Sequence, residues 1–234
     1  MKLLVTGSLQ VTPEELAYLR EMGHEVTLHQ WEKDPVECPE QYEDVICNGL
    51  FLYNPIEQFT NLRYIQLTSA GYDRVPMDYV HAHGIEIRNA RGVYSAPMAE
   101  FALCGVLQLY KESRFFYENQ KARLWEKHRG LRELCGKTVC IVGCGSVGTE
   151  CALRFRAFGC RITGVDLYPR AAEPYAEMAG LDALEEQLRT ADVVVLTLPL
   201  TAQTHHLMNK ERLLLLKPGC VLVNIARGAV VDTD

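Results

Sequence analysis

The sequence has no apolar run of membrane-spanning length and no surplus of basic charge. A transmembrane helix needs roughly 20 consecutive apolar residues, whereas the apolar stretches here are interrupted after a few positions. The apolar stretch that follows Met1 is too short for a signal peptide. Lys and Arg number 24 against 30 Asp and Glu, so the net charge is −6. Binding to a phosphate backbone needs clustered Lys and Arg. We therefore expect neither a membrane nor a nucleic acid as partner.

The cysteines lack any regular pattern. Nine are scattered along the chain, an odd number that does not indicate a disulfide framework. No CxxC pair is present, and no second cluster of cysteine and histidine accompanies Cys140 and Cys144, so we expect no metal site. These two thiols are predicted to serve as small apolar side chains. A reducing, cytoplasmic location is expected for the protein.

What the sequence does contain is the composition of an ordinary globular protein. Apolar residues make up 48% of the chain and charged residues 23%. A length of 234 residues allows one large domain or two modest ones. Disorder is not expected.

Residues 137–148, KTVCIVGCGSVG, run from a short β-branched stretch into three glycines with the spacing G-x-G-x-x-G. The stretch predicts a strand that is buried on both faces of a parallel sheet. Gly143 allows a tight turn, Gly145 lets backbone approach a pyrophosphate, and Gly148 lets the next helix pack closely on the strand. The motif predicts a dinucleotide site, although a glycine-rich turn of an unrelated α/β protein has the same spacing.

Two further features strengthen the dinucleotide prediction. The helix after the turn begins near Ser146 and Val147, where free N–H groups face an anion. A second apolar run, residues 161–165, ends in Asp166 at roughly the distance along the chain where an acid meets the ribose 2′-hydroxyl.

The first ninety or so residues alternate between short strands and helices, which predicts a small α/β unit with a parallel sheet. Thr12 and Pro13 predict a helix start, and the following apolar side chains, as far as Met22, predict its buried stripe. Two loops, residues 48–51 and 68–73, follow strand ends, where ligands bind in open parallel sheets. Small residues at 69–71 leave N–H groups open for a carboxylate, although a tight turn without a ligand remains the alternative.

Residues 96–108 predict an amphipathic helix that starts near Pro97 and serves as the hinge between two domains, residues 1–95 and 96–234. Its continuation carries large apolar side chains, among them Phe115, Tyr117 and Trp125. A dimer interface explains them, and so does packing within the chain.

From residue 137 the strands and helices alternate regularly, which predicts a doubly wound parallel sheet. Helices are expected at residues 147–158 and 181–188 and after Asn209, and strands at residues 193–198 and 220–225. Arg227 lies just past the last of these strands, and its planar guanidinium suits a carboxylate or 2-oxo acid. A surface salt bridge is the alternative role.

With these motifs in order, the chain resembles the D-isomer-specific 2-hydroxyacid dehydrogenases over essentially its whole length. The resemblance rests on residues 69–73, 92–100, 143–148 with Asp166, 198–201 with Thr204, and 217–228. It implies a Rossmann-type doubly wound sheet, incomplete at the C-terminus, and a smaller flavodoxin-like α/β substrate domain. It also implies NAD as cofactor, a small 2-oxo or 2-hydroxy acid as substrate, and a homodimer.

The resemblance also implies roles for individual residues. The amides of Ala70 and Gly71 would hold the substrate carboxylate, Arg227 would clamp the carboxylate and 2-oxo group, and Asp166 would favour NAD over NADP. Side chains expected to line the substrate pocket are Leu50 and Tyr94. The remaining cofactor contacts implied by the resemblance are Met98, Leu198, Pro199, Thr204, Ile225 and Ala226.

The family completes its site with a glutamate and an acid–base histidine a few tens of residues beyond the arginine. This sequence ends at Asp234, so we expect the chain alone to be inactive. His205, His206 and Glu100 are expected to have ordinary structural roles. The alternative to a dehydrogenase is a non-catalytic NAD-binding module with a regulatory or partner-binding role. The sequence leaves the substrate open among glyoxylate, hydroxypyruvate, phosphoglycerate and branched 2-oxo acids.

Overall fold

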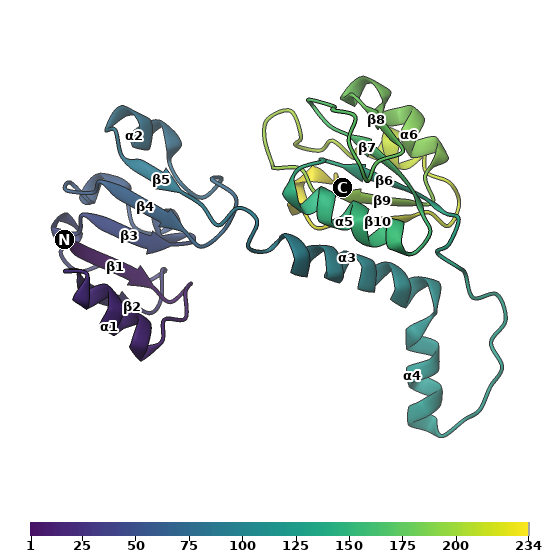
Figure 1. Cartoon of the computed structure of the whole chain (residues 1–234), viewed down its shortest axis with the longest axis horizontal. Helices are drawn as coiled ribbons and strands as arrows, with labels where there is room; N and C mark the ends of the chain where they lie inside the picture. The colour runs from purple at the N-terminus through teal and green to yellow at the C-terminus, as the bar shows by residue number, and fades with distance from the viewer. Residues whose placement is uncertain (234) are drawn as a thin grey trace. The chain divides into compact units, whose positions relative to one another are not determined.

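The computed structural model describes residues 1–233 and divides the chain into two compact units (Figure 1). Unit 1 comprises Met1–Arg91 and unit 2 comprises Gly92–Asp234. The sequence placed this division between residues 95 and 96.

Unit 1 is built on a five-stranded parallel sheet in the order β2-β1-β3-β4-β5. The strands are β1 Lys2–Thr6, β2 Glu25–His29, β3 Asp44–Cys47, β4 Tyr64–Leu67 and β5 Glu86–Arg88. Val5 of β1 lies opposite Leu28 of β2 on one side and Ile46 of β3 on the other. This strand order is that of flavodoxin-like sheets, so the predicted class of the first unit is confirmed.

The helices of unit 1 are short, and the predicted core face of the first one is wrong. They are α1 Pro13–Glu21, α2 Met77–Ala82 and the 3₁₀ turns Pro39–Gln41, Leu50–Leu52 and Ile56–Gln58. Thr12 caps α1 through a capping box with Glu15, as the sequence predicted. However, α1 has no buried residue, and Met22 is 60% exposed. The neighbouring β2 is an edge strand and is itself largely exposed, so it cannot cover the apolar side of the helix.

Unit 2 contains a second five-stranded parallel sheet, in the order β10-β9-β6-β7-β8. The strands are β6 Thr138–Val142, β7 Arg161–Val165, β8 Glu177–Ala179, β9 Val193–Leu196 and β10 Val221–Asn224. Counted from β6, the order is that of the first five strands of the dinucleotide-binding fold, which confirms the predicted Rossmann-type sheet. The sequence missed β8, which has only three residues and no run of apolar side chains.

The helices of unit 2 are α3 Ser95–Tyr110, α4 Ser113–Ala122, α5 Ser146–Ala157, α6 Leu184–Thr190 and α7 Lys210–Leu213, with 3₁₀ turns at Leu181–Ala183 and Gly228–Val230. Of these, α3 and α5 pack on one face of the sheet and α6 on the other. Val139 and Ile141 of β6 pack with side chains of α3 and α5, whereas Cys140 and Val142 pack with α6. This alternation along one strand is what a sheet that is buried on both faces requires.

Helix α3 extends two residues beyond the C-terminal end of the predicted 96–108 helix. After α4 the chain runs without regular secondary structure from Leu124 to Leu134 before it enters β6. None of the helices within residues 1–233 has both the length and the apolar content needed to cross a bilayer.

Candidate functional site

The glycine turn between β6 and α5 is closed on two sides by backbone. Gly143 has φ +97°, and a Cβ placed there would lie 2.7 Å from the backbone nitrogen of Leu198. A Cβ on Gly148 would lie 2.1 Å from the carbonyl oxygen of Gly143. Real Cβ atoms do not approach so closely, so both positions need glycine for the fold itself.

Gly145 differs from the other two glycines of the turn. Its φ is −74°, which any residue adopts, and a Cβ there would meet no atom of the described residues 1–233 within 4 Å. It is also the N-cap of α5, and no side chain caps that end of the helix. The first N–H groups of α5, at Ser146 and Val147, are therefore not covered by a side chain of Gly145. Such a helix start suits an anion that approaches the backbone closely and binds the free N–H groups.

Asp166 follows β7 and is tied to the glycine turn. Its Oδ2 accepts a hydrogen bond from the N–H of Cys144 at 2.7 Å, and its Oδ1 accepts one from the N–H of Tyr168 at 3.0 Å. The carboxylate therefore lies at the rim of the turn, where it can accept hydrogen bonds from ribose hydroxyls and repel a 2′-phosphate.

The cysteines of the turn serve as apolar side chains. Cys140 is fully buried, and burial raises the pKa of its thiol to about 12. Burial also raises the pKa of the Cys144 thiol, to about 11. Both thiols stay protonated at neutral pH and are poor nucleophiles.

The loop after β9 lies over the glycine turn. The hydroxyl of Thr197 donates to the carbonyl oxygens of Gly143 and Val142. Farther along, the hydroxyl of Thr204 donates to the carbonyl of Pro199 at 2.6 Å and accepts from the N–H of Thr201 at 2.8 Å. These bonds leave Leu198 buried and Pro199 exposed at the tip of the loop.

The start of α3 lies beside the start of α5. The hydroxyls of Ser95 and Ser146 are 2.7 Å apart and hydrogen-bonded. Met98 is half-buried in the first turn of α3, and Tyr94, just before the helix, is 47% exposed. Both predicted contact residues thus lie at the end of α3 that adjoins the glycine turn.

Arg227 is held at the end of β10 by a side chain that the sequence analysis overlooked. Asn224 Oδ1 accepts from the N–H of Ala226 at 3.0 Å, and its Nδ2 donates to the carbonyl of Arg227 at 2.8 Å. Ile225 is anchored through its N–H to the carbonyl of Leu196 at 3.2 Å. An asparagine at the end of a strand is a known turn signal and points to this arrangement. The guanidinium is half-buried and donates to the carbonyl of Ala226 at 3.0 Å.

In unit 1, the loop after β4 presents two open amides. Asn89 Nδ2 donates to the carbonyl of Ala70 at 2.7 Å, and the N–H of Ala90 donates to the carbonyl of Ser69 at 2.9 Å. Within residues 1–233, the N–H groups of Ala70 and Gly71 donate no hydrogen bond. The carbonyls of this loop are thus fixed while its amides remain available to an acceptor such as a carboxylate.

The prediction for Leu50 needs correction. Its side chain is fully buried in the core of unit 1, together with Ile56 and Phe59. The Leu50–Leu52 turn points this side chain inward, so it cannot line a pocket open to a ligand.

The histidines and Glu100 have structural contacts. His205 and His206 stack with their ring centroids 3.9 Å apart, and His206 Nδ1 lies 3.9 Å from Asp232 Oδ2. Glu100 on α3 accepts from Arg154 of α5 at 3.3 Å. Among residues 1–233 there is no group of three His, Cys, Asp or Glu side chains arranged to hold a metal ion.

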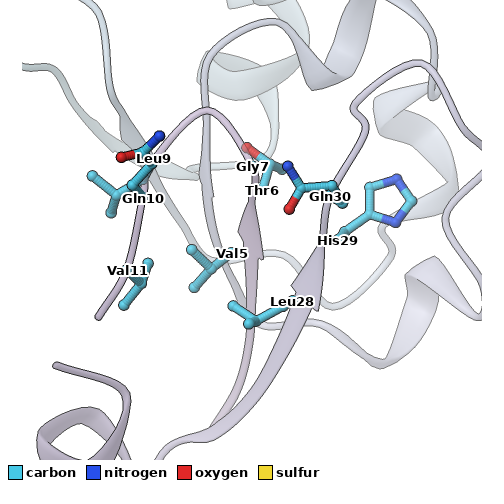
Figure 2. Close-up of a pocket in the computed structure, with 9 residues that line it drawn as sticks. All are labelled: Val5, Thr6, Gly7, Leu9, Gln10, Val11, Leu28, His29 and Gln30. Carbon is cyan, nitrogen blue, oxygen red and sulfur yellow. The ribbon is translucent and has the colours of Figure 1, made fainter. Parts of the chain in front are cut away.

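A hollow of about 320 Å³ lies at the ends of β1 and β2 in unit 1 (Figure 2). Val5, Val11 and Leu28 form its apolar side, and Gln30 lies against Gly7 in the loop that closes it. It contains none of the predicted site residues and no carboxylate, lysine or arginine. We therefore do not regard it as the site of the chemistry.

Comparisons with known proteins agree with the geometry of unit 2. Residues 103–234 match the family described as D-isomer specific 2-hydroxyacid dehydrogenase, NAD binding domain. The chain is 38% identical to a glyoxylate reductase of Thermococcus kodakarensis over 185 residues, which are 74% of this chain and 54% of that protein. It is 33% identical to a D-lactate dehydrogenase of Treponema pallidum over 176 residues, 74% of this chain and 52% of that protein.

A solved structure is similar over nearly the whole chain. The D-lactate dehydrogenase from Aquifex aeolicus, crystallised with NAD and lactic acid, matches with a TM-score of 0.83 and 26% identity, over 99% of this chain and 71% of that one. The chain spans about half of the length of the two sequence relatives.

Proposed function

The chain belongs to the D-isomer-specific 2-hydroxyacid dehydrogenase family, and we propose on that basis that the protein is an NAD-dependent oxidoreductase acting on a small 2-oxo or 2-hydroxy acid. The relatives' names include glyoxylate reductase and D-lactate dehydrogenase, and either substrate falls within this class. The cofactor supplies the hydride chemistry, whereas the protein binds and orients the cofactor and the substrate and polarises the substrate.

The observation that carries the proposal is the difference among the three glycines. Gly143 and Gly148 are required by close backbone contacts, but no atom of residues 1–233 lies within 4 Å of a Cβ placed on Gly145 at the start of α5. That space, with Asp166 at the rim, fits the pyrophosphate and ribose of a dinucleotide. We assign the pyrophosphate to the amides of Ser146 and Val147 and the ribose hydroxyls to Asp166.

We assign the remaining cofactor contacts to loops at the same edge of the unit 2 sheet. Leu198, Pro199 and Thr204 belong to the loop over the glycine turn, and Ile225 and Ala226 belong to the turn held by Asn224. Met98 is assigned to the nicotinamide side because it lies on the first turn of α3, which is bonded to the start of α5.

We assign substrate recognition to each unit separately. In unit 1, the amides of Ala70 and Gly71 are oriented by fixed carbonyls and are suited to a carboxylate. The exposed Tyr94, at the start of unit 2, is assigned to the substrate pocket. In unit 2, Arg227 presents a planar guanidinium that is suited to a carboxylate or 2-oxo group, and Asn224 fixes its backbone.

Cofactor preference tests the proposal. NADH should bind to the chain more tightly than NADPH does, because Asp166 repels a 2′-phosphate. The Asp166→Ser variant should lose about 10-fold or more in NADH affinity, as expected when hydrogen bonds to a charged group are removed. The same variant should also reduce the ratio between the affinities for NADH and NADPH. Affinities are measured by fluorescence titration of each nucleotide.

The control is Asp182→Ser, at an exposed position of the same unit. Equal affinity for both nucleotides in the unaltered chain would contradict the assignment of Asp166. Binding of NADH by the product of the whole reading frame without turnover of any 2-oxo acid would favour a non-catalytic module.

A homodimer is proposed from the apolar surface of α3 and α4. Phe101 and Leu109 on α3 are 75% and 58% exposed, Tyr117 on α4 is 61% exposed, and Trp125 after it is 97% exposed. Large apolar side chains exposed along two consecutive helices are typical of protein interfaces, and a second copy of the chain would cover them. A reducing, cytoplasmic location is proposed from the nine cysteines, several of which are buried as core residues.

A further inference from the structure

A carboxylate of unit 1 is bound by groups from two separate segments of the chain, and it comes from a third. Glu32 Oε1 accepts from the hydroxyl of Thr6 and from the N–H of Asn48, both at 2.7 Å. Its Oε2 accepts from the N–H of Gly49 at 2.7 Å. These distances are short for hydrogen bonds from N–H groups, as expected when the acceptor is charged.

This carboxylate lies at the carboxyl ends of two neighbouring strands of the unit 1 sheet. Thr6 ends β1, and Asn48 and Gly49 follow β3 directly. β1 and β3 are neighbours at the point where the strand order of the sheet reverses. In open parallel sheets, ligands bind outside the carboxyl ends of the strands at this reversal. Glu32 therefore lies where a ligand of such a sheet is expected.

The surroundings fix both the carboxylate and its donors. The hydroxyl of Ser8 lies 2.8 Å from that of Thr6 and accepts from Thr68 at 3.2 Å. The buried Asn54 donates to the backbone carbonyl of Glu32 at 3.0 Å, so the main chain that carries the carboxylate is held as well. Glu32 itself comes from the segment after β2 and is far from its partners in sequence.

We propose that Glu32 is the internal ligand of this sheet reversal. Its carboxylate accepts hydrogen bonds from two backbone amides and one hydroxyl. Without the Glu32 side chain, these donors would bind a small external carboxylate. The Glu32 carboxylate thereby fixes the turn formed by residues 49–53, in which Leu52 and Tyr53 are exposed. Glu32 is a positioning residue for this turn. The inference concerns unit 1 alone and does not rest on the proposed dehydrogenase activity.

One consequence concerns the two loops of unit 1 that were predicted from the sequence to lie where ligands bind, residues 48–51 and 68–73. The amides of Asn48 and Gly49 are taken by Glu32, whereas those of Ala70 and Gly71 donate to no group within residues 1–233. A substrate carboxylate in unit 1 is therefore directed to the second loop.

Chemical rescue tests the proposal. The change Glu32→Ala removes the atoms of one acetate ion, so acetate is the matched probe. The variant should melt about 5 °C or more below the unaltered chain, because three hydrogen bonds to a charge are lost. Saturating acetate should restore about a third or more of that loss. It should leave the unaltered chain unchanged, and chloride at equal ionic strength should have no such effect.

Amide shifts give a readout that general destabilisation would not produce. In nitrogen-15 spectra, the N–H signals of Asn48 and Gly49 should move in Glu32→Ala and return towards their original positions as acetate is added. If that variant does not fold, Glu32→Gln serves instead, and the same two signals should move because one charged acceptor is lost.

The matched control is Glu21→Ala, an exposed glutamate of the same unit. It should neither lower the melting temperature by more than a degree or so nor respond to acetate. An unchanged melting temperature in Glu32→Ala would overturn the proposal. Equal stabilisation by acetate and chloride, or unmoved Asn48 and Gly49 signals, would overturn it as well.

Discussion

Two glycines of the glycine turn are required for the fold, and the third is the one that we propose serves cofactor binding. Gly143 and Gly148 lie against backbone, and any side chain there displaces the loop over the turn or the start of α5. Gly145 lies beside space and adopts a φ that alanine also adopts. The three positions share a motif, yet only the first two are explained by the protein's own packing.

The contrast leads to a paired prediction. Gly148→Ala should lower the free energy of unfolding by roughly 1–3 kcal/mol, the usual cost of overpacking, because its Cβ would lie 2.1 Å from the Gly143 carbonyl. Gly145→Ala should leave stability within roughly 0.5 kcal/mol. It should weaken NADH binding about 10-fold or more, because a methyl group keeps the pyrophosphate from the backbone.

Urea unfolding and nucleotide titration are the two measurements. Gly105→Ala is the control, because this mid-helix glycine of α3 also faces open space, and the change should preserve NADH binding. Full NADH affinity in Gly145→Ala would contradict the placement of the pyrophosphate.

Secondary-structure elements of unit 2 are joined by one aspartate at the strand starts. Asp192, just before β9, accepts from the N–H of Thr138 at the start of β6 at 2.9 Å and from Lys217 before β10 at 3.0 Å. Burial disfavours the charged form of Asp192, but these two hydrogen bonds outweigh it and hold the pKa of the carboxyl below its usual range. The ion therefore stabilises the junction of three neighbouring strands.

Asp192 should make the stability of the chain depend on pH. A carboxyl whose pKa is lowered by folding contributes its full stabilisation above its unfolded pKa of about 3.9. The contribution is lost as the pH falls from that value through the folded pKa. Asp192→Asn should cost roughly 1–3 kcal/mol at pH 7, and the difference from the unaltered chain should shrink below about pH 4.

Urea unfolding at pH 7, 5 and 3.5 measures this difference, with Asp182→Asn as the exposed control. A cost for Asp192→Asn that stays constant over the three pH values would show that the charge of the carboxylate does not matter.

For the whole molecule, the proposed dimer interface is formed by exposed apolar side chains of α3 and α4. We expect the chain to be dimeric in solution, and Phe101→Glu to give a monomer, because a two-fold interface repeats each added charge. Light scattering after gel filtration measures the mass. Leu214→Glu is the control, since Leu214 is 75% exposed and directly follows α7, outside α3 and α4. A monomeric unaltered chain would contradict the proposed interface.

The parts of the fold that local chemistry dictates were predictable. The strand into Gly143, the helix after it and the Thr12 cap depend on residues a few positions apart, and their patterns are visible in one stretch of sequence. Strand β8 was not predicted, because a strand of three residues without an apolar run is too short to show a recognisable hydrophobic pattern. The positions of the site loops followed from the strand ends, since carboxyl ends of parallel strands share one edge.

The sequence by itself determined two parallel α/β units, a dinucleotide turn and the family, because glycine spacing, strand composition and capping act over short distances along the chain. Tertiary structure alone decided that Leu50 points into the core, that no residue of α1 is fully buried and that Asn224 holds Arg227. It also decided that the carboxylate of Glu32 accepts hydrogen bonds from the amides after β3. These outcomes depend on which distant segments meet, and that is set by the packing of the whole unit.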